Sequence, residues 1–421
     1  MRRNRIGVGT WGLAAISAVL MFAHSVRAGT RYEILHSFAN NRDSSPNPEA
    51  GVIFDTAGNL YGTTSYYYGE VFELMPHSGH WSETTLHKFK AGRDGQSPWA
   101  PLVFDRAGNL YGTTGGGGLG CNGSGCGTVF ELSHVQGGHW AETVLYRFTG
   151  GLDGRNPQAG LVFDALGNLY GTTTWGGDPS CNRGTGCGTV FELTPNRGGW
   201  TETVLHAFTG GRDGAYPFLA GVILDSKGSL YGTTVGYTIG TPEGTGTVFQ
   251  LTRSGNGRWK HRVLYTFPGG SDGYPAAGLT FGLDGKLYGT TQGGGPQTIC
   301  CGTVFQLKRS KAGWQETTLH SFTGADGAFP LAGVIFDKKG NLYGITPEGG
   351  PGHCFFGCGV VFKLERSKNS WTETVLHSFG VQPGDGYLPV GGLTLDKEGL
   401  LYGTTSYGGE AGYGTVFRIA P

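Results

Sequence analysis

The chain has 421 residues, with 31 basic and 31 acidic side chains, 81 glycines, 24 phenylalanines, 19 tyrosines and 9 tryptophans. This charge balance excludes the strongly basic surface that nucleic-acid binding requires, and it gives no attraction to an anionic membrane surface. The aromatic content excludes a disordered chain, because disordered chains lack the side chains that build cores. The many glycines must therefore serve turns.

The N-terminus has the pattern of a secretory signal peptide. Arg2, Arg3 and Arg5 precede an apolar stretch that runs to Phe22, and a small-residue cleavage pattern ends at Ala28. Glycines interrupt the stretch, and no apolar run of about 18 residues follows it, which argues against a membrane span. We expect residues 1–28 to be removed. The remaining single domain, residues 29–421, loses four arginines and keeps 27 basic against 31 acidic side chains.

One sequence unit is repeated seven times after this segment. The tag Leu-Tyr-Gly-(Thr/Ile)-Thr recurs every 50 to 60 residues or so, and repeats on roughly that scale are typical of propellers and solenoids. Short runs of β-branched and aromatic residues alternate with Gly, Asn, Asp and Pro, while helical periodicity is missing, so we expect an all-β fold. The tag tyrosines are Tyr61, Tyr111, Tyr170, Tyr231, Tyr288, Tyr343 and Tyr402.

Each unit contains four strand-like runs, here termed A to D. An Asp-x-x-Gly-Asn segment between A and B predicts a tight hairpin, because Asp caps the turn and Gly accepts a positive φ; Gly282 replaces this Asp in the fifth unit. Four antiparallel strands repeated around an axis form a β-propeller, which leaves few exposed sheet edges. A parallel β-solenoid is the alternative, but it needs no hairpin in every unit.

The two ends of the domain predict how the ring closes. The domain begins with a D run, Tyr32 to Phe38, and stops at a C run, Gly414 to Ile419. One unit is therefore divided between the termini. We expect a seven-bladed β-propeller of four-stranded blades, whose ring is closed because the N-terminal strand completes the last blade.

The repeated residues resemble a known family. The pattern A-G-L-x-F-D-x-x-G-N-L-Y-G-T-T, then G-T-V-F-E-L, then W-x-E-T-x-L-H-S-F-x-G-G-x-D-G is similar to the GloVer tandem-repeat proteins, also called choice-of-anchor tandem-repeat proteins. The resemblance covers residues 32–419 and implies an exported bacterial repeat protein. Members usually end in an anchoring segment, whereas this sequence ends at Pro421, so we expect a secreted or periplasmic protein.

The loops of such a propeller separate into two faces. With A innermost, the D-to-A and B-to-C connections share one face, here termed the loop face, and the A-to-B and C-to-D turns share the hairpin face. The B-to-C loops vary in length, and variable loops on a rigid scaffold usually carry function. Their aromatic rings could stack on an extracellular glycan or anchor a protein partner, or each could cover its own loop. The candidate ligand-binding residues are Tyr66, Tyr67, Trp175, Tyr237, Phe355, Phe356 and Tyr407, with Tyr68 and Tyr413 beside them.

Eight cysteines form four local pairs in four B-to-C loops. An even number in an exported protein predicts disulfides, and cysteines on four separate blades cannot gather around one zinc ion. Neighbouring Cα atoms lie about 3.8 Å apart, below the usual disulfide range of about 4.4–6.8 Å, so a bond between adjacent cysteines would be strained. The candidate pairs are Cys121/Cys126, Cys181/Cys187, Cys354/Cys358 and the adjacent Cys300/Cys301.

Two polar residues also recur with the unit, an Asp in the D-to-A loop and a His in strand D. One carboxylate per loop is far short of the six to eight oxygens that Ca²⁺ takes, so we interpret the Asp as a turn residue. Tyr146 and Tyr265 replace the His in two units, which favours packing over metal binding, and we expect no metal or cofactor. The recurring residues are Asp43, Asp94, Asp153, Asp213, Asp272, Asp326 and Asp385, and His36, His87, His206, His320 and His377.

The sequence predicts no catalytic residue. The start of the A strands, at the mouth of the central tunnel, is small and apolar, with Glu49 as its titratable residue. We therefore expect a binding or scaffold module for glycan or protein ligands at the loop face; a polysaccharide hydrolase or lyase and a purely structural envelope protein are the alternatives. A hydrolase could use a carboxylate pair from the non-repeating acids Glu70, Asp178, Glu243, Glu348 and Glu410.

Overall fold

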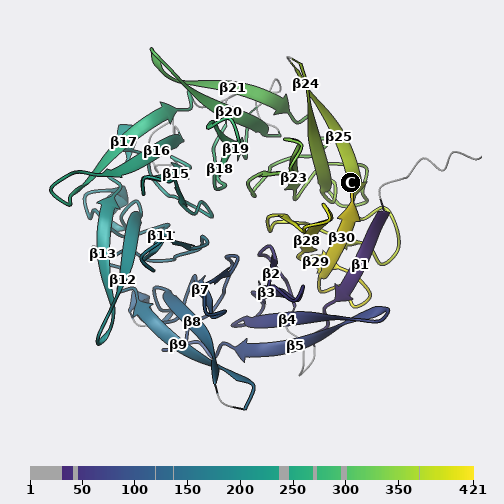
Figure 1. Ribbon diagram of the computed structural model, residues 1–421, viewed down its shortest axis with the longest axis horizontal. Helices are drawn as coiled ribbons and strands as arrows, with labels where there is room; N and C mark the ends of the chain where they lie inside the picture. The colour runs from purple at the N-terminus through teal and green to yellow at the C-terminus, as the bar shows by residue number, and fades with distance from the viewer. Residues whose placement is uncertain are drawn as a thin grey trace, which may run out of the picture.

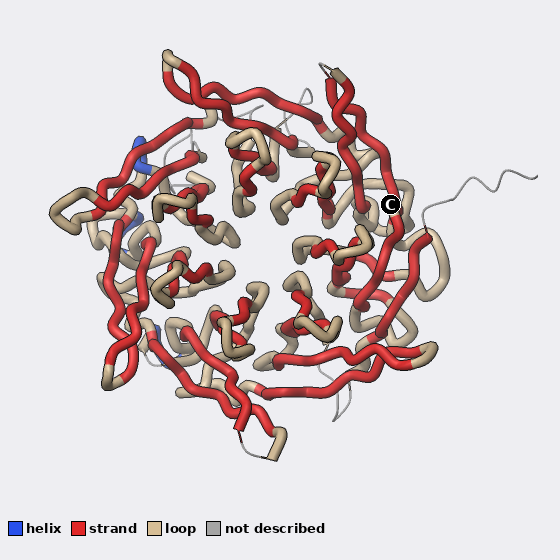
Figure 2. Tube along the Cα trace, in the orientation of Figure 1, coloured by secondary structure: helices blue, strands red, loops and turns tan. Residues whose placement is uncertain are grey.

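The computed structural model describes residues 31–40, 46–118, 120–135, 137–236, 246–268, 273–294, 301–368 and 370–421. Seven antiparallel four-stranded sheets surround a central axis (Figures 1 and 2). The expected seven-bladed all-β propeller is thereby confirmed. No helix in the described ranges has the length and hydropathy needed to cross a membrane. Predictions that fall outside the described residues concern the signal segment 1–28, Asp43, Tyr237, Glu243, Asp272 and Cys300.

Strands A to D of each blade follow one another from the axis outward, as expected (Figure 1). The strands of the first four blades are β2 (Ile53–Phe54), β3 (Leu60–Thr64), β4 (Glu70–His77) and β5 (His80–Lys88); β6 (Val103–Phe104), β7 (Leu110–Thr114), β8 (Thr128–Val135) and β9 (His139–Arg147); β10 (Val162–Phe163), β11 (Leu169–Thr173), β12 (Thr189–Asn196) and β13 (Gly199–Ala207); and β14 (Ile223–Leu224), β15 (Leu230–Thr234), β16 (Thr247–Arg253) and β17 (Trp259–Thr266).

The last three blades repeat the same order, and a two-stranded ribbon is added on the loop face. The strands are β18 (Thr280–Phe281), β19 (Leu287–Thr291), β20 (Thr303–Ser310) and β21 (Gly313–Ser321); β22 (Ile335–Phe336), β23 (Leu342–Thr346), β24 (Val360–Ser367) and β25 (Ser370–Ser378); β27 (Thr394–Leu395), β28 (Leu401–Thr405), β30 (Thr415–Ala420) and β1 (Arg31–Ser37); and the ribbon of β26 (Gly386–Tyr387) with β29 (Tyr407–Gly408). Short 3-10 turns cover Cys121–Gly123, Asn182–Gly184 and Gly211–Asp213.

The ring closes as the chain ends predict. Strand β1 pairs antiparallel with β30, from Arg31 opposite Ala420 to Ser37 opposite Thr415, and Figure 1 shows these purple and yellow strands side by side. The Phe38 N–H then donates a hydrogen bond to the Gly414 carbonyl at 2.9 Å. Blade 7 therefore contains both ends of the domain.

The glycine of each Leu-Tyr-Gly tag makes room for the phenylalanine of strand C. In blade 3, a Cβ built on Gly171 would lie 2.5 Å from Cζ of Phe191 and 2.8 Å from Cδ2 of Leu161. The Phe191 side chain is fully buried. Because protein cores are packed at crystal density, a neighbour cannot yield by that much without disturbing the blade. The repeated Gly and the repeated Phe are thus one packing unit.

The hairpin between A and B is organised by its aspartate, as expected. Asp164 Oδ1 accepts hydrogen bonds from the Leu166 and Asn168 N–H groups at 2.8 and 2.9 Å. The Tyr170 hydroxyl donates to Asp164 Oδ2 at 3.1 Å, a link between turn and tag that the sequence did not suggest. Burial opposes ionisation, but the hydrogen bonds, led by that of Asn168, lower the pKa of Asp164.

Blade 5 keeps this turn although Gly282 replaces the aspartate. Asp284, two residues later, accepts a hydrogen bond from the Tyr288 hydroxyl at 3.1 Å and pairs with Lys286 at 2.7 Å. A carboxylate from a shifted position therefore satisfies the same tyrosine, which explains why the blade tolerates the exception.

Adjacent blades are joined through the proline of the D-to-A loop. A Cβ on Gly188, which precedes strand C of blade 3, would lie 2.7 Å from Cδ of Pro217 in the next loop. Tyr216, just before this proline, has φ 57°, and its N–H donates to the Cys187 carbonyl at 2.8 Å. The Thr172 hydroxyl adds a bond to the Ala220 carbonyl at 3.1 Å. These contacts explain why Pro and the Gly of Gly-Thr-Val-Phe recur together.

Candidate functional site

The D-to-A and B-to-C loops lie on one face, as the strand order requires. Backbone bridges join the two kinds of loop, for example Arg155 with Trp175 and Ala328 with Glu348, and between blades 6 and 7 they form the ribbon of β26 and β29. The loop face is therefore one connected surface, which surrounds the opening of the central tunnel.

Local disulfides brace three of the B-to-C loops. The bonded pairs are Cys121–Cys126, Cys181–Cys187 and Cys354–Cys358, with Cα atoms 5.3, 5.7 and 5.1 Å apart, so these three predictions are confirmed. Cys301 is buried, and its expected partner Cys300 lies outside the described residues. Disulfides persist in oxidising compartments.

Exposed aromatic side chains are confined to one part of this face. Among the described residues, every exposed tyrosine, phenylalanine or tryptophan side chain lies in the loops of blades 6, 7 and 1, which are neighbours in the ring (Figure 1). The most exposed are Phe355, at 93%, and Tyr67, at 74%. We term the whole set the aromatic patch, and it consists of Tyr66, Tyr67, Tyr68, Phe355, Phe356, Tyr387 and Tyr407.

The rings of the aromatic patch are arranged in pairs. Tyr66 and Tyr67 meet edge to face with centroids 4.4 Å apart, and Phe355 and Phe356 do so at 4.6 Å. Tyr387 stacks on Tyr407 at 5.5 Å with an interplanar angle of 16°. Each pair holds its rings in a defined orientation, which lowers the entropy that a ligand must overcome.

Backbone hydrogen bonds connect the loops that carry these pairs. Ser406 donates to Leu388, and Leu388 donates to Cys358, which links the ribbon to the disulfide loop of blade 6. Asn47 donates to the carbonyl of Tyr413, and Ser65 donates to Asn47, which links blade 7 to blade 1. The three pairs thus lie on a single braced arc of the ring.

The remaining aromatic candidates are placed differently. Trp175 is half-buried in blade 3, its ring 4.7 Å from that of Tyr216 and below the guanidinium of Arg155, so it packs against the two neighbouring D-to-A loops. Tyr413 is half-buried, and Tyr237 is not described. Tyr387 was not among the residues predicted from the sequence, because it lies in a D-to-A loop whose evident pattern is the repeated Asp and Pro.

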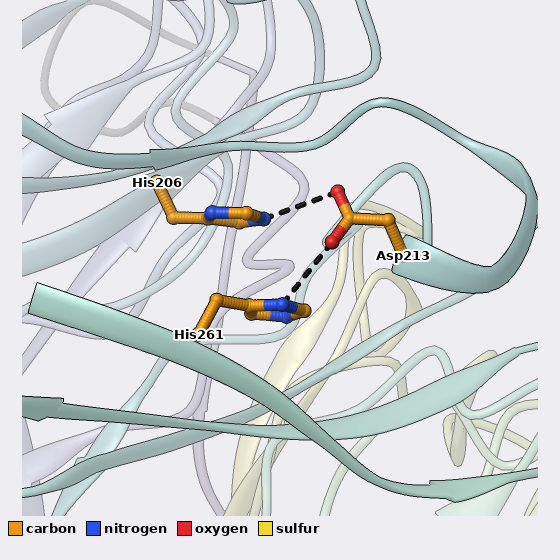
Figure 3. A group of neighbouring side chains, drawn as sticks. All are labelled: His206, Asp213 and His261. Atoms are coloured by element: carbon orange, nitrogen blue, oxygen red, sulfur yellow. Dashed lines mark hydrogen bonds and ion pairs between the residues drawn. The ribbon is translucent and has the colours of Figure 1, made fainter.

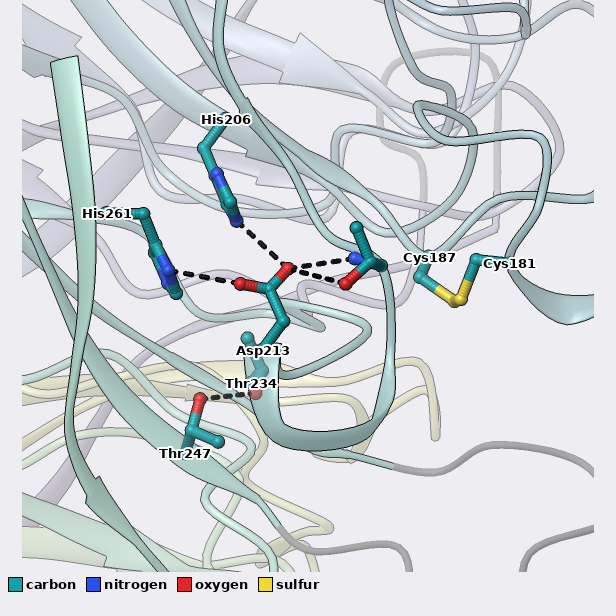
Figure 4. Close-up of polar contacts among 8 residues, drawn as sticks. Cys181, Cys187, His206, Asp213, Thr234, Thr247 and His261 are labelled. Atoms are coloured by element: carbon teal, nitrogen blue, oxygen red, sulfur yellow. Dashed lines mark hydrogen bonds and ion pairs between the residues drawn. A yellow bond between two sulfur atoms is a disulfide. The ribbon is translucent and has the colours of Figure 1, made fainter.

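The recurring Asp and His prove to be partners. His206 Nε2 lies 3.1 Å from Asp213 Oδ2, and His261 Nδ1 of the next blade lies 3.1 Å from Asp213 Oδ1 (Figure 3). Asp213 also stabilises the turn in which it lies (Figure 4). Its Oδ2 accepts hydrogen bonds from the N–H and from the hydroxyl group of Thr209. Burial raises the pKa of Asp213, but the hydrogen bonds from both histidines outweigh it and hold that pKa far below the usual range.

Two histidines and a carboxylate could suggest a metal centre, and their atoms lie within 4.8 Å of one another. The rings of His206 and His261, however, are stacked 4.0 Å apart with an interplanar angle of 3°. An ion bound by both imidazoles must lie near the plane of each ring, and two parallel stacked rings share no plane. The geometry favours a hydrogen-bonded contact between blades.

Equivalent contacts recur around the ring, with glutamate in place of His261. Glu142 lies beside His87 and Asp94, and Glu202 and Glu373 occupy the same position of strand D in blades 3 and 6. Among the described residues, each of these three glutamates has a buried Oε1 without a hydrogen-bond partner. Burial first, and then the charge of the neighbouring Asp, raises the pKa of each to about 7.

These glutamates make stability depend on pH. The pKa of Glu142 in the folded protein, about 7, exceeds its ordinary value of 4.5, so its contribution to stability is present below about pH 4.5 and is lost as the pH rises through about 7. We therefore expect the Tm of Glu142→Gln, measured relative to that of the parent, to rise by at least roughly 2 °C when the pH is raised from about 6 to about 8.5. Glu398→Gln, at an exposed position, is the control in thermal scans, and equal pH profiles for both variants would contradict the prediction.

The acids considered for a carboxylate pair are dispersed. Glu70 is fully buried and lies 3.6 Å from Lys88. Asp178, Glu348 and Glu410 belong to the loops of blades 3, 6 and 7. Glu243 is not described. This distribution lends no support to glycoside cleavage by these residues, and the hydrolase alternative stays a prediction.

Solved structures of other propellers resemble this fold at low sequence identity. A proposed 6-phosphogluconolactonase from Bacteroides uniformis has a TM-score of 0.49 at 12% identity, covering 84% of this chain and 89% of that one. A gluconolactonase from Xanthomonas campestris has a TM-score of 0.41 at 14% identity, covering 90% and 98%. Such remote likeness carries no argument about activity. A search of curated protein sequences finds no match.

The family is shown by the sequence repeat itself. The profile of the Gloeobacter/Verrucomicrobia repeat matches residues 21–240 and 220–421, which together span most of the chain. These matches include all seven tags and the strands of every blade. The chain therefore belongs to the Gloeobacter/Verrucomicrobia repeat family.

Proposed function

We propose that this protein is an exported binding module that holds a carbohydrate polymer on the aromatic patch of its loop face. The observation that carries the proposal is that, in the part of the chain that the structure describes, exposed aromatic rings are confined to blades 6, 7 and 1. Exposure of apolar rings to water costs free energy, so a patch of them on a monomer surface usually marks a binding surface. The disulfides support export to an oxidising compartment.

The kind of side chain favours sugar over a general hydrophobic partner. Among their described residues, the patch loops contribute seven exposed aromatic residues but one exposed aliphatic residue, Val381, whereas Leu152, Leu166 and Leu283 are exposed in other blades. Flat rings can stack on the apolar C–H face of a pyranose, while the hydroxyl groups of the sugar stay hydrated. Carboxylate and tyrosine hydroxyl groups nearby, such as those of Glu410 and Tyr407, can hydrogen-bond to the sugar rim.

A long ligand fits this arc better than a compact one. The three ring pairs belong to three successive blades, and a polymer can contact them in sequence. Once one sugar of the polymer is bound, its neighbours are held at a high effective concentration near the other ring pairs, so several weak stacking contacts together give a higher affinity. The loops are held rigidly, because blade strands flank each of them. In addition, a disulfide crosslinks the loop of blade 6, and the β26–β29 ribbon holds the loop of blade 7.

The experiment is a glycan-array screen of the mature protein, followed by affinity electrophoresis on the polysaccharide that binds. Tyr67→Ala and Phe356→Ala should each weaken retention by roughly tenfold, because an anchoring ring contributes more than about 1 kcal/mol. Leu166→Ala removes an apolar side chain that is 81% exposed in a turn of the hairpin face and serves as the matched control. Retention should be unchanged in this control.

Two outcomes would overturn the proposal. The first is parent protein that no glycan retains, and the second is equal retention of the parent and of both patch variants. Thermal unfolding of every variant should stay within a few degrees of the parent, since the substituted side chains lie on the surface.

A further inference from the structure

A second candidate site opens at the centre of the loop face. A cavity of about 480 Å³ lies where the A strands begin, and small-molecule sites have volumes of roughly 300–1,000 Å³. All seven blades contribute to its wall, and none of the aromatic patch residues does. The side chains that matter below are those of Glu49, Trp99, Gln158 and Phe218.

Bare backbone forms much of the wall between these side chains. A Cβ on Gly51 would lie 2.4 Å from the Gly392 carbonyl oxygen, and one on Gly221 would lie 2.9 Å from that of Gly160. Neighbouring A strands approach each other so closely that larger residues cannot be accommodated there. The few side chains of the wall therefore decide what the cavity can bind.

The charge of the cavity is set by one residue. Among the described residues of the wall, Glu49 is the one that titrates, and no lysine, arginine or histidine accompanies it. Burial raises the pKa of Glu49, against a hydrogen bond from Ser65. A carboxylate in apolar surroundings is costly unless a cation or hydrogen bonds compensate it.

The uncharged side chains of the cavity wall also bear on which ligand it can bind. Trp99 and Phe218 are the aromatic residues that line the cavity, and aromatic rings attract cations through their quadrupole. Gln158 is buried, and its amide oxygen already accepts a hydrogen bond from Thr174 at 3.0 Å. Its NH₂ group is thus the part that remains for a ligand, and it can donate to a hydroxyl or carbonyl oxygen.

We propose that the mouth of the central tunnel is a binding site for a small organic ammonium ion. Glu49 neutralises the positive charge, and Trp99 and Phe218 pack on the carbon skeleton around the nitrogen. Anionic ligands are disfavoured by the carboxylate, and neutral ligands leave its desolvation uncompensated. This site is independent of carbohydrate binding by the aromatic patch.

Isothermal titration calorimetry at about pH 8, where carboxylates ionise, tests the site with three probes of similar size: benzyltrimethylammonium, benzyl alcohol and benzoate. Benzyltrimethylammonium should bind at least tenfold more tightly than the other two. Glu49→Gln, which keeps the shape of the side chain, and Trp99→Leu should each weaken the binding of this cation about tenfold.

Two control variants distinguish this site from the charged and aromatic groups elsewhere on the loop face. Glu410→Gln removes an exposed carboxylate of the same face, and Tyr67→Ala removes a ring of the aromatic patch; both should bind the cation like the parent. The proposal is overturned if the cation does not bind the parent, if benzyl alcohol binds equally well, or if either control weakens binding as much as Glu49→Gln. Unchanged melting temperatures show that the variants are folded.

Discussion

Replacement of Phe38 by alanine is expected to lower the unfolding free energy by about 3–5 kcal/mol, the usual cost of removing a buried aromatic ring. Phe38 is fully buried and lies edge-on to Phe72 of blade 1, with ring centroids 5.1 Å apart. Its N–H is bonded to Gly414 of blade 7. The residue therefore holds the closing strand β1 against both blades, and urea unfolding measures the loss.

Phe208→Ala is the matched control for this variant. Phe208 occupies the same position in blade 3, is also fully buried, and meets Phe249 at 5.2 Å. We expect a similar loss of unfolding free energy, but a different response to a protease. Strand β13 remains joined to β12 by a hairpin, whereas β1 is held in blade 7 by non-covalent contacts alone, so Phe38→Ala should be cut faster between β1 and β2. A loss below about 1 kcal/mol, or identical cleavage of both variants, would show that Phe38 does not hold the closing strand.

Gly414→Ala is expected to lower the unfolding free energy by about 2–4 kcal/mol. Overpacking contributes roughly 1–3 kcal/mol and the left-handed backbone about 1 more. A Cβ at Gly414 would lie 2.6 Å from Cδ of Pro48 and 2.5 Å from the Thr405 carbonyl oxygen, and its φ is 103°. The change thus separates blade 7 from blade 1 where the termini meet.

The neighbouring Gly412 provides the control. It has a positive φ of 84°, but a Cβ there meets no atom within 4 Å. Gly412→Ala should therefore show the backbone cost without the packing cost, and the difference between the two variants in urea unfolding isolates the contact between blades. If both variants lose the same unfolding free energy, the proline contact does not stabilise closure.

Much of the fold could be predicted because the same sequence signals recur in nearly every repeat. The turn signal at Asp164, the glycine at Gly171 and the divided unit at the termini each follow from local chemistry. These local patterns did not predict which side chains of neighbouring blades contact each other. Asp213 and His261 are 48 positions apart in sequence but bonded in space, and no periodic pattern reveals that a D-strand glutamate or His261 meets the Asp of the preceding blade.

The candidate site was predicted less completely, and for a physical reason. A ring in a glycine-rich loop can face solvent or fold back, and the choice depends on neighbours from another segment. Trp175 packs against Tyr216 and Arg155 and is half-buried. Tyr67 contacts the ring of its neighbour Tyr66 and is exposed. The sequence identified the residue types on the loop face, and tertiary contacts decided which of them a ligand can reach.

The pairing of β1 with β30 also sets the order in which the molecule folds. The first strand of the domain to be synthesised pairs with the last, since Arg31 lies opposite Ala420. Blades 1 to 6 contain strands that are contiguous in the chain and can form as they are synthesised, but β1 stays an unpaired edge until β30 has been made. Contacts between such distant segments slow folding and prolong the exposure of aggregation-prone edges. We therefore expect the completion of blade 7 to be the slowest step of folding.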